Sequence, residues 1–171
     1  MEAIECIMTR ASVRQYTGEK ISEEDMLKII KAGMNAPSAR NIQPWRFIIL
    51  RDGKLLDEFT EKLPYCKMLK NAGAGVVVCG VLDKDFEYAE KYWTLDCSAA
   101  TENILLAAHA LGYGAVWTAL YPNEERISIV RAALKMPRNV VPLNIIPIGT
   151  PKEKPNHKDK FKEDIIHYDK W

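Results

Sequence analysis

Arg10, Ser12 and Arg14 occupy alternate positions in the stretch TRASVRQY near the start of the chain. In an extended segment, side chains two residues apart point to the same side of the backbone. Two guanidinium groups and a hydroxyl can therefore converge on one compact anion, and a phosphate monoester suits the forked donors of arginine. A solvated basic stretch after a helix has the same spacing, so the pattern alone leaves both interpretations open.

A second group of polar residues lies in the stretch NAPSARNIQPW. Ser38, Asn41 and Gln43 offer hydrogen-bond donors and acceptors, while Pro37 and Pro44 restrict the backbone around them. Such a set could read the edge of a polar heterocycle or a polyol chain. Ordinary turn chemistry, in which Ser and Asn bond to nearby backbone, is the alternative.

A third candidate is the stretch GYGAVWTALYP, where backbone amides around Trp117, Thr118 and Ala119 could face a ligand at a strand end. The tryptophan by itself fits a core position. The sequence has no GxGxxG opening a helix, no GxxxxGK[ST] and no GxSxG, and its carboxylates and histidines show no spacing typical of an acid/base pair. If the protein is an enzyme, we expect a cofactor to carry the difficult chemistry.

Composition restricts the class of protein. A chain of 171 residues with 47% hydrophobic residues is expected to form one domain, and a net charge of +1 gives no overall field for nucleic acid. The four cysteines and three histidines lack metal-ligand spacing, which favours reduced thiols. The start does not resemble a signal peptide, and no apolar run approaches the ~20 residues that span a bilayer. We therefore expect a cytoplasmic protein without a membrane or metal site.

The apolar patterns predict helices separated by strands, with Ser22 and Asn123 as N-caps. Predicted helices cover residues 2–9, 22 to before Pro37, 53–63, 90–111 and 123 to before Pro137. Predicted strands cover residues 45–51, 74–82, 114–120 and 140–149. The long helix, whose pattern has no breaker from about Phe86, is apolar on nearly every side and is expected at the centre or at an oligomer interface. The prolines of the last strand are expected at an edge, a strand end or a bulge.

This order of elements indicates an α/β or α+β fold around one sheet, without fixing strand direction. The quoted stretches, followed by DCSAATENILLAAHALGYGAVW, IIPIGTPKEKP and a terminal HYDKW, closely resemble the FMN-dependent nitroreductase family over essentially the whole chain. The resemblance implies an α+β fold with a central, mostly antiparallel four-stranded sheet flanked by helices. It also implies one FMN-binding domain, residues 1–171, in an obligate homodimer with two FMN sites at the interface. The tail, residues 150–171, would reach over the partner subunit and can add a strand.

The resemblance further implies which residues bind FMN. The phosphate and the pyrimidine side of the flavin are assigned to Arg10, Ala11, Ser12 and Arg14. The loop contacts, largely from the other subunit, are assigned to Pro37, Ser38, Ala39, Asn41 and Gln43. The segment beside the isoalloxazine ring comprises Trp117, Thr118 and Ala119, and Gly149 matches the glycine after the last strand. Lys160 matches one of the basic residues that complete the phosphate site and Lys158 is a further candidate, whereas Asp159 stands where Arg is expected.

The activity implied is ping-pong hydride transfer from NADH or NADPH through FMN N5 to a small electron-poor acceptor, such as a nitroaromatic compound or a quinone. Alternatives are reductive dehalogenation, enal reduction or flavin breakdown, or a flavin-binding sensor without turnover. Relatives with such related chemistries often carry a large lid insertion, and the segment between Lys84 and Trp93 is too short for one. Nucleic-acid binding through the lysines of residues 152–162 is disfavoured because acidic residues interrupt them.

Overall fold

The computed structural model describes residues 1–85 and 87–171. Two long antiparallel strands, β2 (Ala74–Val81) and β5 (Val140–Gly149), form the centre of one sheet. β1 (Trp45–Leu50) pairs with β2, and the short strands β3 (Gly114–Ala115) and β4 (Thr118–Ala119) both pair with β5. Every one of these pairings is antiparallel. The α+β fold around an antiparallel sheet is thereby confirmed.

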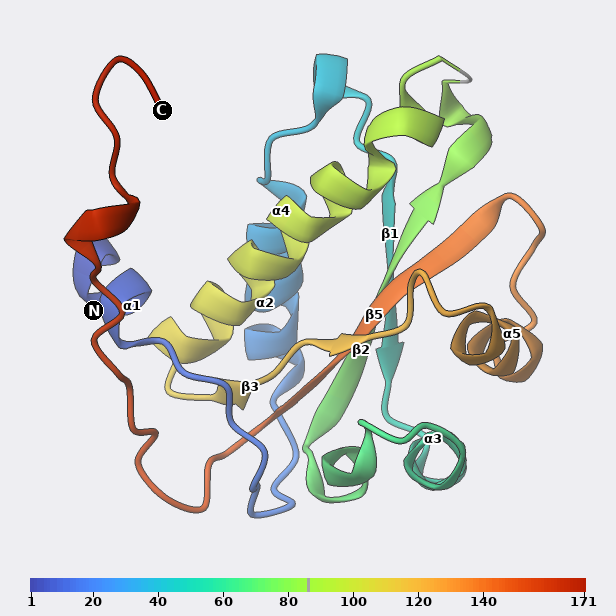
Figure 1. Cartoon of the computed structure of the whole chain (residues 1–171). Helices are drawn as coiled ribbons and strands as arrows, with labels where there is room; N and C mark the ends of the chain where they lie inside the picture. Colours follow the sequence, from blue (N-terminus) through green and yellow to red (C-terminus); the bar gives the residue numbers. More distant parts are fainter. Residues whose placement is uncertain (86) are drawn as a thin grey trace.

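Four helices cover the two faces of the sheet (Figure 1). They are α2 (Glu23–Met34) and α4 (Ala89–Ala110) on one face, and α3 (Gly53–Lys62) and α5 (Glu124–Ala133) on the other. The side chains of β2 alternate accordingly, because successive residues of a strand point to opposite faces. Val76 and Val78 pack on the side of α2 and α4, whereas Val77 and Cys79 pack on the side of α3 and α5.

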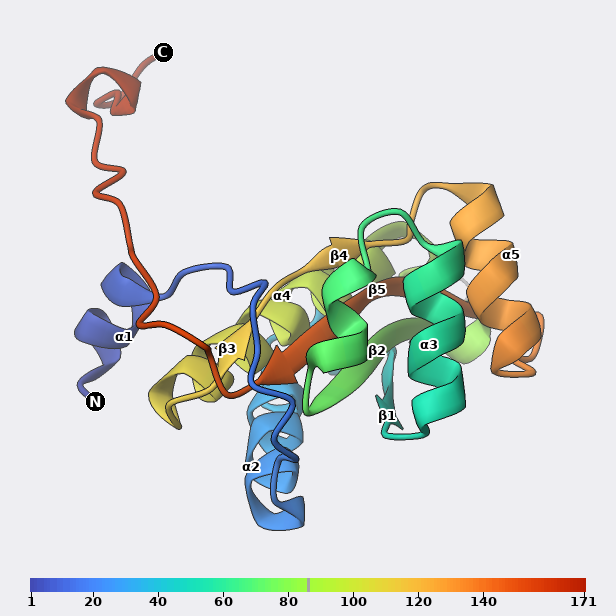
Figure 2. The ribbon, with the colours of Figure 1, turned by 90° about the horizontal axis from the view of Figure 1, so that it is seen from below.

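The remaining elements are short. They are α1 (Ala3–Thr9) and the 3-10 turns η1 (Ala39–Asn41), η2 (Lys67–Asn71), η3 (Leu82–Lys84) and η4 (Glu163–Ile165). Residues 152–171 leave the body of the chain past α1 and extend away from it (Figure 2). Within the described residues, no helix is long and apolar enough to cross a membrane.

The predicted N-caps are confirmed. The Ser22 hydroxyl accepts a hydrogen bond from the Asp25 amide at 3.0 Å, and the Asn123 side chain accepts one from the Arg126 amide at 3.0 Å. Each bond satisfies an amide that has no partner inside its own helix. α4 begins at Ala89, and the start that the pattern allowed near Phe86 lies outside the described residues.

The prediction for residues 114–120 is wrong in one respect, because the strand is broken between β3 and β4. The Val116 amide donates across this break to the carbonyl of Pro147, at 3.3 Å. Proline has no N–H and therefore cannot donate a hydrogen bond to a neighbouring strand. Because β3 and β4 are interrupted opposite Pro147, no residue of these two strands depends on a donor at that position. Pro142 lies at a shift in the register between β2 and β5, where a bulge was expected. β5 itself is a central strand and not an edge.

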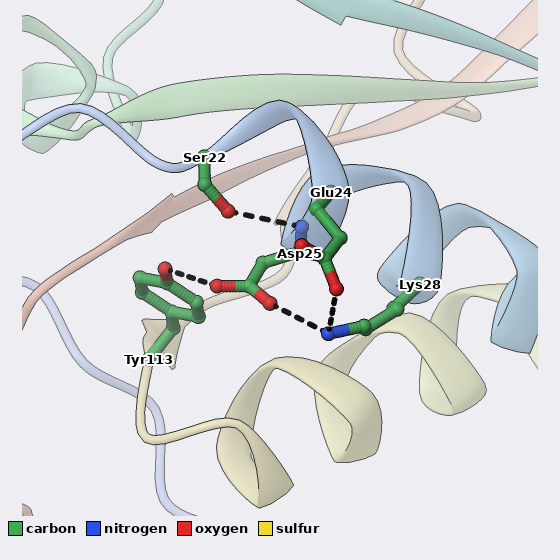
Figure 3. Close-up of polar contacts among 5 residues, drawn as sticks. All are labelled: Ser22, Glu24, Asp25, Lys28 and Tyr113. Carbon is green, nitrogen blue, oxygen red and sulfur yellow. Dashed lines mark hydrogen bonds and ion pairs between the residues drawn. The ribbon is translucent and has the colours of Figure 1, made fainter.

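A polar network joins the start of α2 to the turn between α4 and β3 (Figure 3). The Tyr113 hydroxyl donates to the Asp25 carboxylate at 2.9 Å, and the Lys28 ammonium lies 3.3 Å from the same carboxylate and 2.9 Å from Glu24. These contacts and the Ser22 cap favour ionised Asp25. They lower its pKa, with the Tyr113 hydrogen bond as the largest cause.

Replacing Tyr113 with Phe is expected to lower the thermal unfolding midpoint at neutral pH, because ionised Asp25 loses its strongest donor. Since the pKa of Asp25 is lower in the folded than in the unfolded chain, this stabilisation is complete above the unfolded pKa of about 3.9 and is lost as the pH falls through the folded pKa. The difference between wild type and variant should therefore shrink on acidification. Thermal unfolding followed by circular dichroism at several pH values measures it.

The matched control is Tyr65→Phe, because Tyr65 lies in a turn before η2, outside the tail, and is 61% exposed. This control should leave the midpoint unchanged at every pH. A Tyr113→Phe difference that stayed constant across the acidic range would contradict the role given to Asp25.

Candidate functional site

The segment from Arg10 to Arg14 is extended and runs beside β3. Ser12 forms a parallel bridge with Ala115, and the Val13 amide donates to the Ala115 carbonyl at 3.0 Å. Val13 is buried, whereas Ser12 and Arg14 are exposed. This alternation places Ser12 and Arg14 on the same outward side, as their spacing predicted.

The helix α4 fixes the end of α1 and the direction of Arg10. The Arg10 Nε atom lies 3.1 Å from the Glu102 carboxylate, and the arginine side chain is 20% exposed. Two turns further along α4, His109 Nε2 lies 2.9 Å from the hydroxyl of Thr9. That hydroxyl donates its own proton to the Glu5 carbonyl at 2.7 Å, so the His109 ring donates to Thr9. Burial lowers the pKa of His109, which favours the neutral ring.

Arg10 shares a hollow of about 510 Å³ with the first part of the tail. The hollow is lined by Ile7, Met8 and Arg10 on one side and by His157, Lys158, Asp159, Lys160 and Phe161 on the other. Both tail lysines thus lie around the same space as Arg10, and Asp159 is the acid among these cations. The lining carries three positive charges and one negative charge, and Glu102 adds a second negative charge beside Arg10, so the balance still favours an anion.

Ala11, Ser12 and Arg14 line a neighbouring hollow of about 240 Å³ together with residues 153–156. The RxSxR residues are therefore divided between two hollows, with Arg10 in the first and Ser12 and Arg14 in the second. The tail contributes to both, so its path past α1 decides how the basic groups are grouped (Figure 2).

The loop that precedes β1 is held in an unusual backbone conformation. Arg40, Asn41 and Gln43 have φ values of 49°, 56° and 53°, in the left-handed region. The Ser38 hydroxyl accepts from the Gln43 backbone amide at 3.0 Å, and the Gln43 side-chain Nε2 donates to the side-chain Oδ1 of Asn41 at 2.8 Å. The polar side chains singled out in the sequence therefore brace the loop itself, which is the turn chemistry considered as the alternative.

One contact ties this loop to α4. The Ala39 amide donates to Asp96 Oδ1 at 2.9 Å, and Asp96 is 5% exposed. In addition, the Arg40 guanidinium lies over the Tyr88 ring, 4.6 Å from its centre. Asp96 was not among the site residues predicted from the sequence. The signal that could have identified it is a carboxylate in a run that is otherwise largely apolar except at Glu102 and Asn103.

The third candidate segment, residues 117–119, has one half-buried, one buried and one exposed residue. Thr118 is buried, and its hydroxyl donates to the Ile145 carbonyl at 2.7 Å. Trp117 is half-buried against the cluster formed with α2 and α4, as expected for a core position. Ala119 is exposed, and its carbonyl accepts from Arg126 at 3.3 Å. A ligand at this segment would meet backbone and Ala119 more than polar side chains.

Gly149 is the last residue of β5 and lies against two neighbours. A Cβ atom at this position would be 2.9 Å from the Gly73 amide nitrogen and 3.1 Å from the Tyr16 ring. The Tyr16 hydroxyl in turn donates to the carbonyls of Val13 and Pro147. The absence of a side chain at Gly149 therefore leaves room for the Tyr16 ring, whose hydroxyl joins the Arg10–Arg14 segment to β5.

Within one chain, the loop and the basic segment open onto different spaces. Gln43 lines a hollow of about 380 Å³ beside β1, whereas Arg10 lines the hollow beside the tail. In Figure 1, η1 lies beside the N-terminal half of α4, whereas the basic segment passes near the C-terminal end of this helix. The candidate residues are thus brought together in groups but not into one cavity.

Residues 7–64 and 60–150 match the sequence profile described as the Nitroreductase family. The chain belongs to this family. The match spans most of the chain and includes the RxSxR segment, the loop before β1 and all five strands.

Individual relatives agree with this assignment. A protein of Archaeoglobus fulgidus, provisionally described as an NADH dehydrogenase/NAD(P)H nitroreductase, is 46% identical over 173 residues that cover 99% of each chain. A crystal structure from Parabacteroides distasonis with the same provisional description is 46% identical, covers 98% of both chains and has a TM-score of 0.93. An FMN-dependent nitroreductase from Clostridium difficile is 26% identical, covers 98% of this chain and 99% of its own, and has a TM-score of 0.89. The chain is accordingly an oxidoreductase of the nitroreductase family.

Replacing Gly149 with Ala is expected to lower the free energy of unfolding by about 1–3 kcal/mol, because the added methyl group overpacks the contact with Tyr16 and Gly73. Urea unfolding followed by tryptophan fluorescence measures the change. Gly53→Ala is the matched control, since a Cβ at Gly53 meets nothing within 4 Å. Equal stabilities of wild type and Gly149→Ala would show that the contact relaxes freely.

Proposed function

We propose that the chain is an FMN-dependent NAD(P)H oxidoreductase that reduces a small electron-poor acceptor, such as a nitroaromatic compound or a quinone. The observation that carries the proposal is the hollow in which Arg10, Lys158 and Lys160 meet. The related protein described as an FMN-dependent nitroreductase supports the cofactor. The relative described as an NAD(P)H nitroreductase supports the hydride donor.

The residues present fit the phosphate end of FMN. The ion pair between Arg10 and Glu102 engages Nε, so it orients the guanidinium while its terminal nitrogens can still donate to phosphate oxygens. Lys158 and Lys160 add positive charge on the opposite wall of the hollow. Ser12 and Arg14 extend the same donor row along the outward side of the segment. This donor set has the chemistry that a phosphate monoester requires.

A second copy of the chain would complete the site. Exposed apolar side chains on α1 and α4 argue for a partner surface, since a solvated helix face is normally polar. They are Ile4, Ile7, Met8 and Leu95. Through such an interface, the loop of residues 37–43 of one copy would meet the flavin whose phosphate is held by Arg10 of the other. Residues 1–171 would then be one FMN-binding domain.

The tail of residues 150–171 has the exposed apolar side chains expected of a segment that wraps around a partner subunit. Phe161, Ile165, Ile166 and Trp171 are exposed, and they would be buried by a second copy. β1 has a strand neighbour only on its β2 side in the described sheet, so its other edge can accept an added strand. We propose that the tail of the partner lies along this copy and can pair there.

The chemistry that FMN supplies when bound is ping-pong hydride transfer at N5, first from NAD(P)H and then, after the nicotinamide has left, to the acceptor. The chain contributes binding, orientation and electrostatics. Cations around the hollow hold the phosphate, and amides of the Trp117–Ala119 segment would line the ring. This reaction requires no side chain to act as a general acid or base. It is therefore compatible with a sequence whose carboxylates and histidines show no acid/base spacing.

Stopped-flow mixing of the FMN-loaded protein with NADH or NADPH tests the enzymatic proposal. We expect the flavin absorbance to bleach with at least one of the two nicotinamides and to return when a quinone is added. An FMN that stays oxidised under millimolar NADH and NADPH would contradict the enzyme and leave a flavin-binding sensor.

Replacing Arg10 with Ala is expected to weaken FMN binding by about 1.5–3 kcal/mol, since one charge-assisted partner of the phosphate is lost. Titration of the apoprotein with FMN, followed by flavin fluorescence, measures the affinity. Arg138→Ala removes an equal charge from an exposed turn and should leave the affinity unchanged. Equal affinities of the Arg10 variant and the wild type would remove Arg10 from the site.

A further inference from the structure

We infer that Asp96 is a positioning residue for the flavin site, and that it acts by holding the loop of residues 37–43 in the conformation offered to the partner's cofactor. The inference rests on the proposed function, because it assumes that this loop meets FMN. It adds a residue of α4 that contacts the loop and to which the sequence analysis gave no role.

The position of Asp96 is an expensive one for a carboxylate. The side chain is 5% exposed, and burial raises the pKa of the group. An apolar residue of similar size would be the less costly occupant of this site on α4. Its Oδ1 atom accepts a hydrogen bond from the Ala39 amide at 2.9 Å. A buried carboxylate in this place is explained by what it does for the loop.

The loop needs an anchor outside itself. Three of its residues, Arg40, Asn41 and Gln43, have a left-handed backbone, a conformation disfavoured for residues other than glycine. Such conformations persist only where surrounding contacts determine them. The bond from the Gln43 amide to Ser38 closes the loop on itself, whereas the bond from Ala39 to Asp96 attaches it to a residue 57 positions away.

The donor that Asp96 engages is the first amide of the η1 turn. Such amides point out of the start of a helical turn and require an external acceptor. A carboxylate accepts more strongly than a neutral group, so it fixes both the position of Ala39 and the start of the turn. Since Asn41 lies in the same turn and Gln43 follows it two residues later, this contact helps to place both side chains.

The second carboxylate oxygen makes a conservative variant informative. Asp96 Oδ2 is buried and has no hydrogen-bond partner among the described residues. Asn at this position keeps the acceptor for Ala39 and breaks no other bond made by the Asp96 carboxylate in the described chain. Asp96→Asn should therefore preserve the loop, whereas Asp96→Ala removes its acceptor.

The first experiment compares FMN affinity in Asp96→Ala, Asp96→Asn and the control Glu90→Ala, which removes an exposed carboxylate of the same helix. We expect Asp96→Ala to weaken binding about tenfold, as expected for the loss of one charge-assisted hydrogen bond, and to change the visible circular dichroism of the bound flavin. Asp96→Asn should restore both, and Glu90→Ala should change neither. Wild-type affinity and spectrum in Asp96→Ala would overturn the inference, while failure of the wild type to bind FMN would instead overturn the proposed function.

A double-mutant cycle tests whether Asp96 acts through the Ala39 amide. Ala39→Pro removes the donor from the other end of the bond, and Pro is tolerated at the first position of a helical turn. Ser38 already has φ −142° and ψ 154°, the region favoured before proline. The double variant with Asp96→Ala should bind FMN no more weakly than the weaker single variant. Additive losses would show that the two residues act independently and contradict the inference.

Mixed dimers test whether the loop acts on the cofactor of the partner. Arg10→Ala and Asp96→Ala chains are unfolded together, refolded at equal concentrations and titrated with FMN. If the loop serves the partner's site, each mixed dimer has one site with both residues intact, so about a quarter of all sites should regain wild-type affinity. Absence of any such sites, with Asp96→Ala weak on its own, would place the loop's effect within its own chain and overturn the inference.

Discussion

β2 is buried on both faces, and covering both faces determines the rest of the architecture. Every residue from Ala74 to Gly80 is shielded from solvent, which a strand achieves only when a layer packs on each side. α2 and α4 form one layer, and α3 and α5 form the other. Because β5 pairs along the whole length of β2, it is drawn into the same interior position in spite of its two prolines.

Among these covering elements, α4 carries the parts of the site. Asp96, Glu102 and His109 contact the loop before β1, the Arg10 guanidinium and Thr9, respectively. These three positions span about 20 Å of helix axis. A packed helix is rigid, so segments that are 57 and 100 positions away from their contacts in sequence are held at fixed places relative to one another.

The site is nevertheless built from groups that one chain leaves apart. Basic groups gather where the tail passes α1, while the left-handed loop lies beside β1 and opens onto another hollow. A loop with a disfavoured backbone that internal hydrogen bonds hold in place is prepared before any ligand arrives, which reduces the ordering that binding would require. A second copy is the component that would join the two groups, and the exposed apolar residues of α1 and the tail are the surface on which it would dock.

The sequence by itself determined what depends on neighbours along the chain. Ser22 and Asn123 cap helices because their acceptors lie three residues from the amides that they satisfy, and the alternation of Ser12 and Arg14 follows from extended backbone. Family membership was also readable from the motifs, since their residue types and order extend over nearly the whole chain.

Only the tertiary structure decided the strand order, the break opposite Pro147 and the attachment of Ala39 to Asp96. The physical reason is that each of these joins residues far apart in sequence. Local periodicity fixes which side of an element is apolar, but it does not specify which distant segment that side will meet.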